Sequence, residues 1–194
     1  MNIESKKEFP SLENHFLVSM PKMQDPNFSS SVSLVCQHNK NGALGVIINH
    51  PVDNLGLKDI LNQLELDYSD KNIGTTNRVF KGGPVHPQHG LVLHENQLDW
   101  ESSLRISEDL VLTSSLDVLR SIAAGDGPAK FLMILGYAGW GPGQLELEIQ
   151  QNSWLTMAAN PEIIFSTPAE KKWQKTIINM GIDITQLSSD VGRA

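Results

Sequence analysis

The sequence predicts a single α+β domain built around a mixed β-sheet. Its 194 residues fall in the usual range for one domain. Strand-like and helix-like segments are interspersed without strict strand–helix–strand alternation, which favours an α+β class. The run KFLMILGYAG (130–139) is continuously apolar, as expected of a central strand buried on both faces. We therefore predict one domain over residues 15–194, preceded by a mobile arm (residues 1–14) that has little to bury.

The first predicted elements are strands. HFLVSMP (15–21) reads as a strand that is stopped by its terminal proline. SVSLVCQHN (31–39) and GALGVIINHP (42–51) are rich in β-formers, and the Asn-Lys-Asn-Gly segment between them favours a hairpin because Asn and Gly tolerate positive φ. Pro51 is predicted to end the second strand of that hairpin.

A helix, a loop and two short strands are predicted next. Residues 56–66 carry apolar side chains at the i, i+3, i+4, i+7 spacing of an amphipathic helix, namely Leu57, Ile60, Leu61 and Leu64. Residues 67–77 are polar and are predicted to be a loop. RVFKGGPV (78–85) and GLVLHE (90–95) read as short strands around a Gly-Pro turn.

The next segment combines a hairpin with a helix. SSLRISEDLVLTSS (102–115) is predicted to form a hairpin. Ser114 or Ser115 can then cap a helix that Gly125 ends.

The last elements follow the apolar run. GPGQLELEIQQN (141–152) fits a strand by the alternation of its apolar residues, but its proline near the start and its early Gln and Glu favour a helix, which we predict. SWLTMAA (153–159) is a predicted strand. The final helix is predicted to have Thr167 as its N-cap and Pro168 as its first residue, and to end at Gly181.

Composition and charge exclude some functional classes. Fifteen basic and 22 acidic residues give a net charge of −7, which works against non-specific nucleic-acid binding. Cys36 is the only cysteine, so no intrachain disulfide can form, and a reducing, cytoplasmic location is expected. The strongly apolar stretches are far shorter than the roughly 20 residues that a membrane helix needs, so no membrane association is predicted. The charged N-terminus does not resemble a signal peptide.

The stretch GYAGWGPGQLELEI (136–149) is the first candidate site. A glycine-rich turn between a strand and a helix can bind phosphate, yet neither a P-loop nor a G-x-G-x-x-G pattern is present. Glu146 and a second glutamate would also repel an anion. We favour a structural corner over a ligand cradle, and expect at least one of its glycines to have positive φ or to press on a neighbouring segment. Gly139→Val or Gly141→Val is then expected to destabilise the fold by on the order of 1–3 kcal/mol.

Two other clusters have weaker claims to chemistry. His86, His89 and His94 lie close together in the sequence, but Pro87 and a glycine argue against a shared helical face, so a metal site is not expected. Cys36 and the histidine two residues after it could share one face of a strand as a nucleophilic pair, although Cys36 is more simply a small core residue.

Several motifs together resemble the YqgE/AlgH family of bacterial proteins. They are LENHFLVSMPKMQDPNFSSSV near the start, GALGVIINHP, GGPV, GYAGWGPGQLELEI, SWL and the final GRA. The resemblance extends over essentially the whole domain. It implies a branched, mixed sheet that curls into a pseudo-barrel with flanking helices.

The resemblance implies little about activity. Family members are often labelled transcriptional regulators, no catalytic activity is established for them, and no catalytic residue, metal or cofactor is implied. His50 and His89 stand where arginine is common in the family, so a basic binding surface is not carried over. We predict a non-catalytic module that binds an unknown protein or small molecule; an unrecognised enzyme that uses the glycine-rich and histidine-rich loops is the alternative. The candidate binding residues are Gly82, Gly83, Pro84, His86, Tyr137, Gly139, Trp140, Gly141, Gly143, Gln144 and Glu146, and an exposed Trp140 would favour ligand binding.

Overall fold

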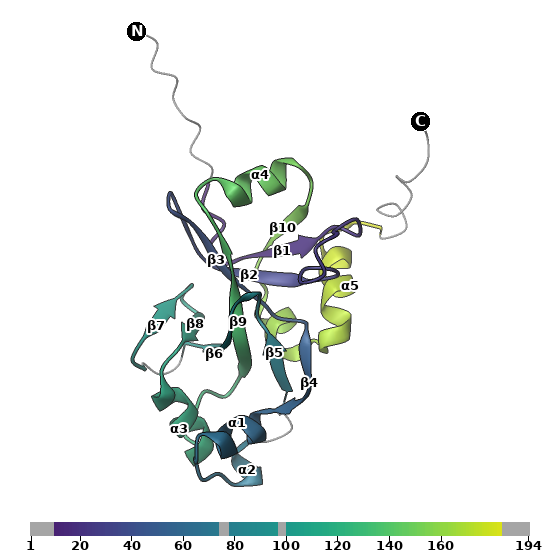
Figure 1. The fold of residues 1–194 in the computed structure, drawn as a ribbon. Helices are drawn as coiled ribbons and strands as arrows, with labels where there is room; N and C mark the ends of the chain where they lie inside the picture. Colours follow the sequence, from purple (N-terminus) through teal and green to yellow (C-terminus); the bar gives the residue numbers. More distant parts are fainter. Residues whose placement is uncertain (1–9, 74–77, 97–99, 184–194) are drawn as a thin grey trace.

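The central element of the fold is strand β9 (Phe131–Trp140). The computed structural model describes residues 10–73, 78–96 and 100–183 (Figure 1). β9 pairs along one edge with β6 (Val85–Glu95), and along the other with β3 (Gly42–Ile47) near its end and with β5 (Arg78–Lys81) near its start. The β5 pairing is parallel and the other two are antiparallel, so the sheet is mixed and branches at β9.

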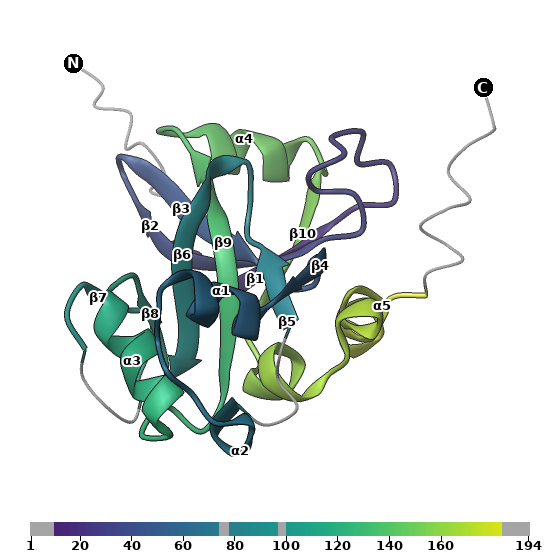
Figure 2. The same cartoon turned by 60° about the horizontal axis from the view of Figure 1, so that its bottom comes forward.

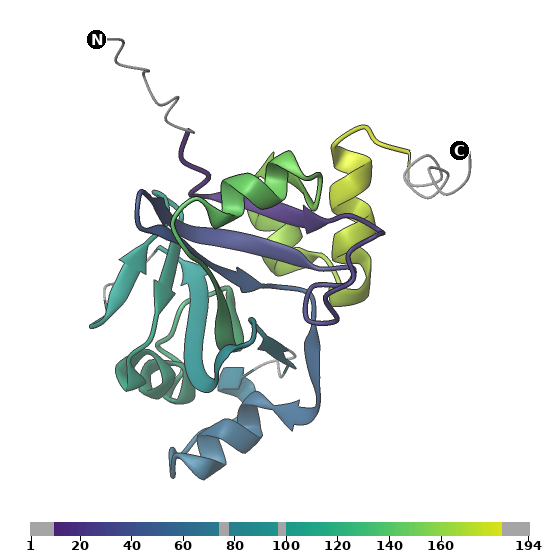
Figure 3. The same cartoon turned by 45° about the horizontal axis from the view of Figure 1, so that its top comes forward.

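The remaining strands extend the sheet on both sides of β9. Beyond β3 lie β2 (Val32–Asn39), β1 (His15–Ser19) and β10 (Trp154–Ala158), all antiparallel to their neighbours. Beyond β6 lie β8 (Leu110–Thr113) and β7 (Ser103–Arg105). The sheet curls into a half-barrel (Figures 1 and 3), which confirms the predicted α+β class and both predicted hairpins.

The helices lie at three places around the sheet. α1 (Leu57–Gln63), α2 (Asp70–Ile73) and α3 (Leu116–Ala124) occupy one end, as Figure 2 shows. α4 (Gln144–Gln150) lies at the opposite end, and α5 (Ala169–Asn179) lies beside β1 and β2 (Figure 1). The helix prediction over the ambiguous segment 141–152 is therefore confirmed.

Each group of helices covers its own cluster of buried side chains. The largest cluster lies between the sheet and α5, and includes Phe16, Leu34, Ile134 and Ile177. A second lies under α1 and α3 and includes Leu57, Leu61, Val118 and Met133. A third lies under α4 and includes Val35, Leu145, Trp140 and Trp154. The sheet therefore has apolar contacts at both of its ends.

Some predicted boundaries are wrong. Pro51 does not end the hairpin: β3 stops at Ile47, and Pro51 begins a further strand, β4 (Pro51–Gly56), which pairs with β5. Proline is tolerated there because it is the first residue of a strand at the edge of the sheet. The predicted loop 67–77 contains the single turn α2, and its residues 74–77 lie outside the described residues.

The start of the last helix also differs from the prediction. Thr167 does not cap α5, because its backbone N–H and its hydroxyl both donate to the carbonyl of Glu162 and close a π-helical turn, Glu162–Ser166. Pro168 takes the capping position instead, and the helix begins at Ala169.

The predicted N-terminal arm lies partly outside the described residues, which begin at residue 10. Its last part is hydrogen bonded to β2, where the Asn14 N–H donates to the carbonyl of Val35. In the described part of the chain, no helix is both long enough and apolar enough to cross a membrane.

Candidate functional site

The glycine-rich stretch forms a corner between β9 and α4. β9 ends at Trp140, and α4 begins after Gly143, which has φ 76° and occupies the N-cap. The side chain of Gln144 folds back, and its Oε1 accepts a hydrogen bond from the Gly141 N–H at 3.0 Å. One of the amides that a phosphate cradle would offer is therefore already used within the corner.

The prediction that at least one glycine of the stretch has positive φ is confirmed at Gly136 and Gly143, but the close backbone approaches do not involve Gly139 or Gly141. Gly136 has φ 72°, and a Cβ on Gly83 would lie 2.3 Å from the backbone carbonyl carbon and oxygen of Tyr137. Gly139 and Gly141 do not have positive φ, and a Cβ on either would meet nothing closer than 3.8 Å. The strain expected at Gly139 and Gly141 is located instead where the Gly82–Gly83 turn crosses β9.

One half of the predicted site residues is brought together beside this crossing. Val85 pairs with Tyr137, and the ring of His86 lies 5.8 Å from the Tyr137 ring. Between Val85 and Gly90 the register jumps, so that residues 86–89 form a bulge opposite Gly136 alone. Gly82, Gly83, Pro84, His86 and Tyr137 are thus neighbours in the structure.

The other candidate residues form the corner and the first turns of α4, where Trp140 is buried but Gly139, Gly141, Gly143 and Gln144 are exposed. Trp140 is only 5% exposed, so the exposed Trp140 that would have favoured ligand binding is not found. Its ring packs with Phe28 and Trp154, and the Trp140 and Trp154 indole N–H groups both donate to Oε2 of Glu148, at 3.0 and 2.8 Å. Glu148 is therefore a structural anchor for the corner.

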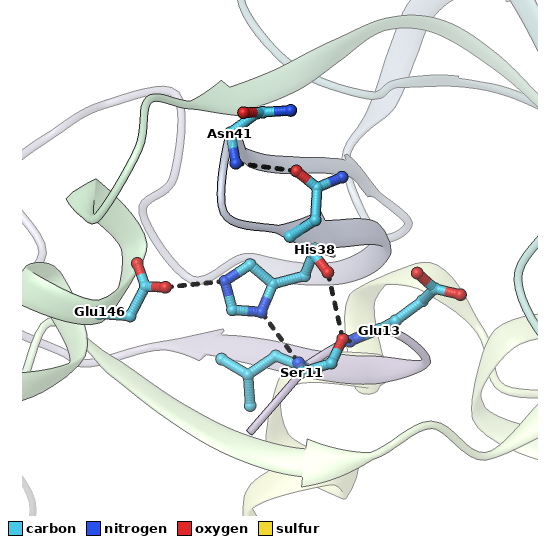
Figure 4. A network of polar contacts seen from close by, with 7 residues as sticks. Ser11, Glu13, His38, Asn41 and Glu146 are labelled. Carbon is cyan, nitrogen blue, oxygen red and sulfur yellow. Dashed lines mark hydrogen bonds and ion pairs between the residues drawn. The ribbon is translucent and has the colours of Figure 1, made fainter. Parts of the chain in front are cut away.

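Glu146 has a similar structural partner that the sequence does not reveal. Its Oε1 lies 3.0 Å from Nε2 of the buried His38, as Figure 4 shows. The Leu12 N–H donates to Nδ1 of His38 at 3.0 Å, so the ring proton must reside on Nε2 and be donated to Glu146. Ser11 donates to the His38 carbonyl at 3.3 Å. His38 thus links α4 to the chain just before β1.

We expect Glu148→Leu to destabilise the protein more than Glu146→Gln. Leucine leaves two buried indole N–H groups without an acceptor, which costs about 2–4 kcal/mol. Glutamine at position 146 still accepts from His38 through its amide oxygen, and the expected loss is about 1 kcal/mol or less. Urea denaturation of both variants measures the difference. Equal losses would contradict the structural role assigned to Glu148.

Cys36 and His38 do not form a nucleophilic pair. Cys36 is the extra residue at a bulge, since Val35 pairs with Gly45 and the next paired residue, Gln37, pairs with Leu44. The bulge turns Cys36 into the cluster under α5, whereas His38 faces α4. Burial raises the pKa of the Cys36 thiol well above its usual range.

We predict that Cys36 is chemically inert in the native protein. A buried, protonated thiol is a poor nucleophile because the thiolate is the reactive form. Reaction with a thiol probe, followed by absorbance, should be far slower in the native state than in urea. Native labelling at the rate of an unfolded thiol would contradict this prediction.

The three neighbouring histidines are also separated. His86 contacts Tyr137 and His89 is exposed. His94 is buried, with its ring nitrogens hydrogen bonded to the Glu95 carbonyl and to Thr113 Oγ1, and its burial lowers its pKa. Within the described residues, no group of three or more His, Cys, Asp or Glu is placed to hold a metal ion.

A groove on the surface was not predicted from the sequence. It lies between α1 and α3, has a volume of about 560 Å³, and borders the bulge through Pro87, Gln88 and His89. We call it the α1–α3 groove. Its apolar lining consists of Leu55, Ile60, Leu64, Val92, Leu116, Leu119, Met133 and Leu135, and its polar lining of Gln63, Gln88, His89, Thr113, Ser114 and Ser115.

Two of the exposed large hydrophobic side chains line the α1–α3 groove at its mouth. Leu64 and Leu116 are each 39% exposed there. Across the described residues, the large hydrophobic side chains that are exposed are these two and Leu147 and Ile178 on other helices. The described residues of the lining include no Asp, Glu, Lys or Arg, and His89 is the ionisable one.

Comparison with known proteins places the chain in a family. The model of the AlgH-like family matches residues 16–185. The chain belongs to the AlgH-like family. Among its AlgH-like relatives, a UPF0301 protein of Methylococcus capsulatus is 47% identical over 190 residues, covering 98% of this chain and 99% of the relative. A UPF0301 protein of Pseudoalteromonas translucida is 44% identical, covering 95% and 99%.

Solved structures confirm the AlgH-like fold. The solution structure of the AlgH protein from Pseudomonas aeruginosa is 40% identical, with a TM-score of 0.76 and full coverage of both chains. The crystal structure of the protein DIP2367 from Corynebacterium diphtheriae has a TM-score of 0.74 over 93% of each chain, at 20% identity. At that identity the second likeness concerns the fold alone.

Proposed function

We propose that this AlgH-like protein is a non-catalytic module that binds a small ligand in the α1–α3 groove. The observation that carries the proposal is an apolar groove of about 560 Å³ with two exposed leucines at its mouth. Small-molecule sites are mostly apolar concavities of about 300–1,000 Å³ with a few polar groups. This size favours a small molecule over a protein partner, the other occupant that the sequence left open.

The side chains that could take part in catalysis have structural partners, which supports a role without catalysis. Glu148 and Glu146 bind indole and imidazole N–H groups under α4, and His94 is held by hydrogen bonds at both ring nitrogens. Cys36 is buried. These residues have structural contacts that account for their positions.

A regulatory role, as the family resemblance implies, would be exerted through occupancy of the groove. A ligand that binds only the folded state with the groove formed would stabilise α1 and α3 and could alter the surface they present. A cytoplasmic location is part of this proposal.

We predict no binding to generic duplex DNA at physiological salt. The net charge of −7 is unfavourable, and among the described residues Lys58, Arg78, Lys130 and Lys175 are paired with carboxylates. A mobility-shift assay with random duplex DNA measures this. Tight binding that weakens with salt would contradict it and favour a direct regulator.

The test of the proposed function uses an uncharged fluorescent probe, N-phenyl-1-naphthylamine. The wild type should enhance its emission, and Leu116→Glu should weaken its binding at least tenfold because a carboxylate at the mouth opposes an apolar occupant. Ile178→Glu is the matched control, since Ile178 is 57% exposed on α5. Both variants should keep the wild-type melting temperature within a few degrees. Equal binding by all three proteins would overturn the groove as the site.

A further inference from the structure

We infer that the ligand of the α1–α3 groove is an uncharged molecule with an apolar body and a single hydrogen-bonding head group, an alcohol or a neutral carbonyl compound. This inference rests on the proposed function and adds the chemical class of the ligand. It draws on three features of the lining: its apolar floor, its polar end and its lack of charge.

The apolar body of the ligand follows from the floor of the groove. Val92, Met133 and Leu119 extend the buried cluster under α1 and α3 directly into the lining. An alkyl or aryl group placed there would continue the protein's own core. Each methylene that the groove buries is expected to tighten binding about threefold to fourfold.

The hydrogen-bonding head group of the ligand is inferred from the polar end of the groove, where the bulge of β6 meets the turn before α3. The side chains of Gln88 and His89 have no hydrogen-bond partner among the described residues. An amide and an imidazole together offer both donors and acceptors. A ligand hydroxyl or carbonyl can therefore exchange hydrogen bonds with them, while its apolar part lies on the floor.

The absence of formal charge on the ligand follows from the electrostatics of the same end. The described residues of the lining include no lysine or arginine to pair with an anion. Ser115 donates its hydroxyl proton to Asp117, so a carboxylate lies directly behind the lining and would repel an anionic head group. No Asp or Glu is among the described lining residues to pair with a cation, and the Asp117 oxygens already accept from the Glu101 and Val118 N–H groups.

The experiment compares three ligands with the same eight-carbon chain. 1-Octanol, octanoate and octylammonium are titrated against the full-length protein loaded with N-phenyl-1-naphthylamine. 1-Octanol should displace the probe at least tenfold more effectively than either ion. 1-Hexanol, two methylenes shorter, should be about tenfold weaker than 1-octanol.

The possible failures can be told apart. Displacement by octanoate or octylammonium at concentrations similar to those of 1-octanol would overturn the uncharged class and leave the groove as the binding site. A probe that fails to bind the wild type, or binds Leu116→Glu equally well, would instead overturn the proposed function. If the ligand is uncharged, Gln88→Ala should weaken 1-octanol binding several-fold. The melting temperature of this variant should not fall, because Gln88 is exposed.

Discussion

Gly83→Ala should lower the free energy of unfolding by on the order of 3 kcal/mol. The added Cβ would lie 2.3 Å from both the carbonyl carbon and the carbonyl oxygen of Tyr137, and 2.5 Å from the backbone nitrogen of Ala138. All three are backbone atoms of the central strand β9, so no flexible side chain can move aside. The turn between β5 and β6 would have to separate from β9, which weakens two pairings of β9 at once.

The matched control for this substitution is Gly139→Ala. Gly139 lies on the same strand, is exposed and does not have positive φ, and an added Cβ would approach only Val85 Cγ2, at 4.0 Å. Its expected effect is below about 1 kcal/mol. Urea denaturation followed by tryptophan fluorescence measures both variants. A larger loss for Gly139→Ala than for Gly83→Ala would contradict the assignment of the close approach to the Gly82–Gly83 turn.

The sequence predicts most elements because their signals are local. The apolar run of β9, the Asn-Lys-Asn-Gly hairpin and the stop at Gly125 each depend on a few neighbouring residues, and each is found in the structure. β4 was missed because its sequence, PVDNLG, has no apolar alternation and forms an edge strand by its pairing with β5. The bulge of residues 86–89 lies opposite Gly136, which has positive φ and is some 50 residues away along the chain.

The candidate site was much harder to predict than the fold. The α1–α3 groove is lined from Leu55 to Leu135, and each of its apolar residues reads as ordinary core in its own element. Leu64 fits the helical pattern of the buried Leu57 and Leu61, yet it is exposed because α1 ends at Gln63. The partners of Glu146 and Glu148 likewise depend on tertiary contacts.

Lys172 provides the second prediction with a large expected effect. Its side chain is almost completely buried, and Nζ donates to the carbonyl of Ile48 at 2.9 Å and to that of Ile164, in the π-helical turn, at 2.7 Å. Nζ also lies 5.2 Å from the centre of the Phe80 ring. Lys172→Met keeps the length of the side chain but leaves both carbonyls without their donor. The expected loss of stability is about 2–3 kcal/mol near pH 10.

The cost of Lys172→Met should depend on pH, with a defined sign. Burial lowers the pKa of Lys172 from its ordinary 10.5 to about 7. This lowering outweighs the stabilisation that the two carbonyls and the Phe80 ring give to the charged amine. Between these two values the unfolded chain binds the proton more tightly than the folded protein, so the stability that Lys172 contributes rises with pH and is lost as the pH falls towards 7. The stability of the wild type minus that of Lys172→Met should therefore increase by roughly 1 kcal/mol per pH unit between pH 7 and 10.

Lys171→Met, at the exposed neighbouring position, is the matched control in the same urea titrations. A difference for Lys172→Met that stays constant over this range would mean that Ile48, Ile164 and Phe80 keep the amine charged in the folded protein, and would overturn the prediction.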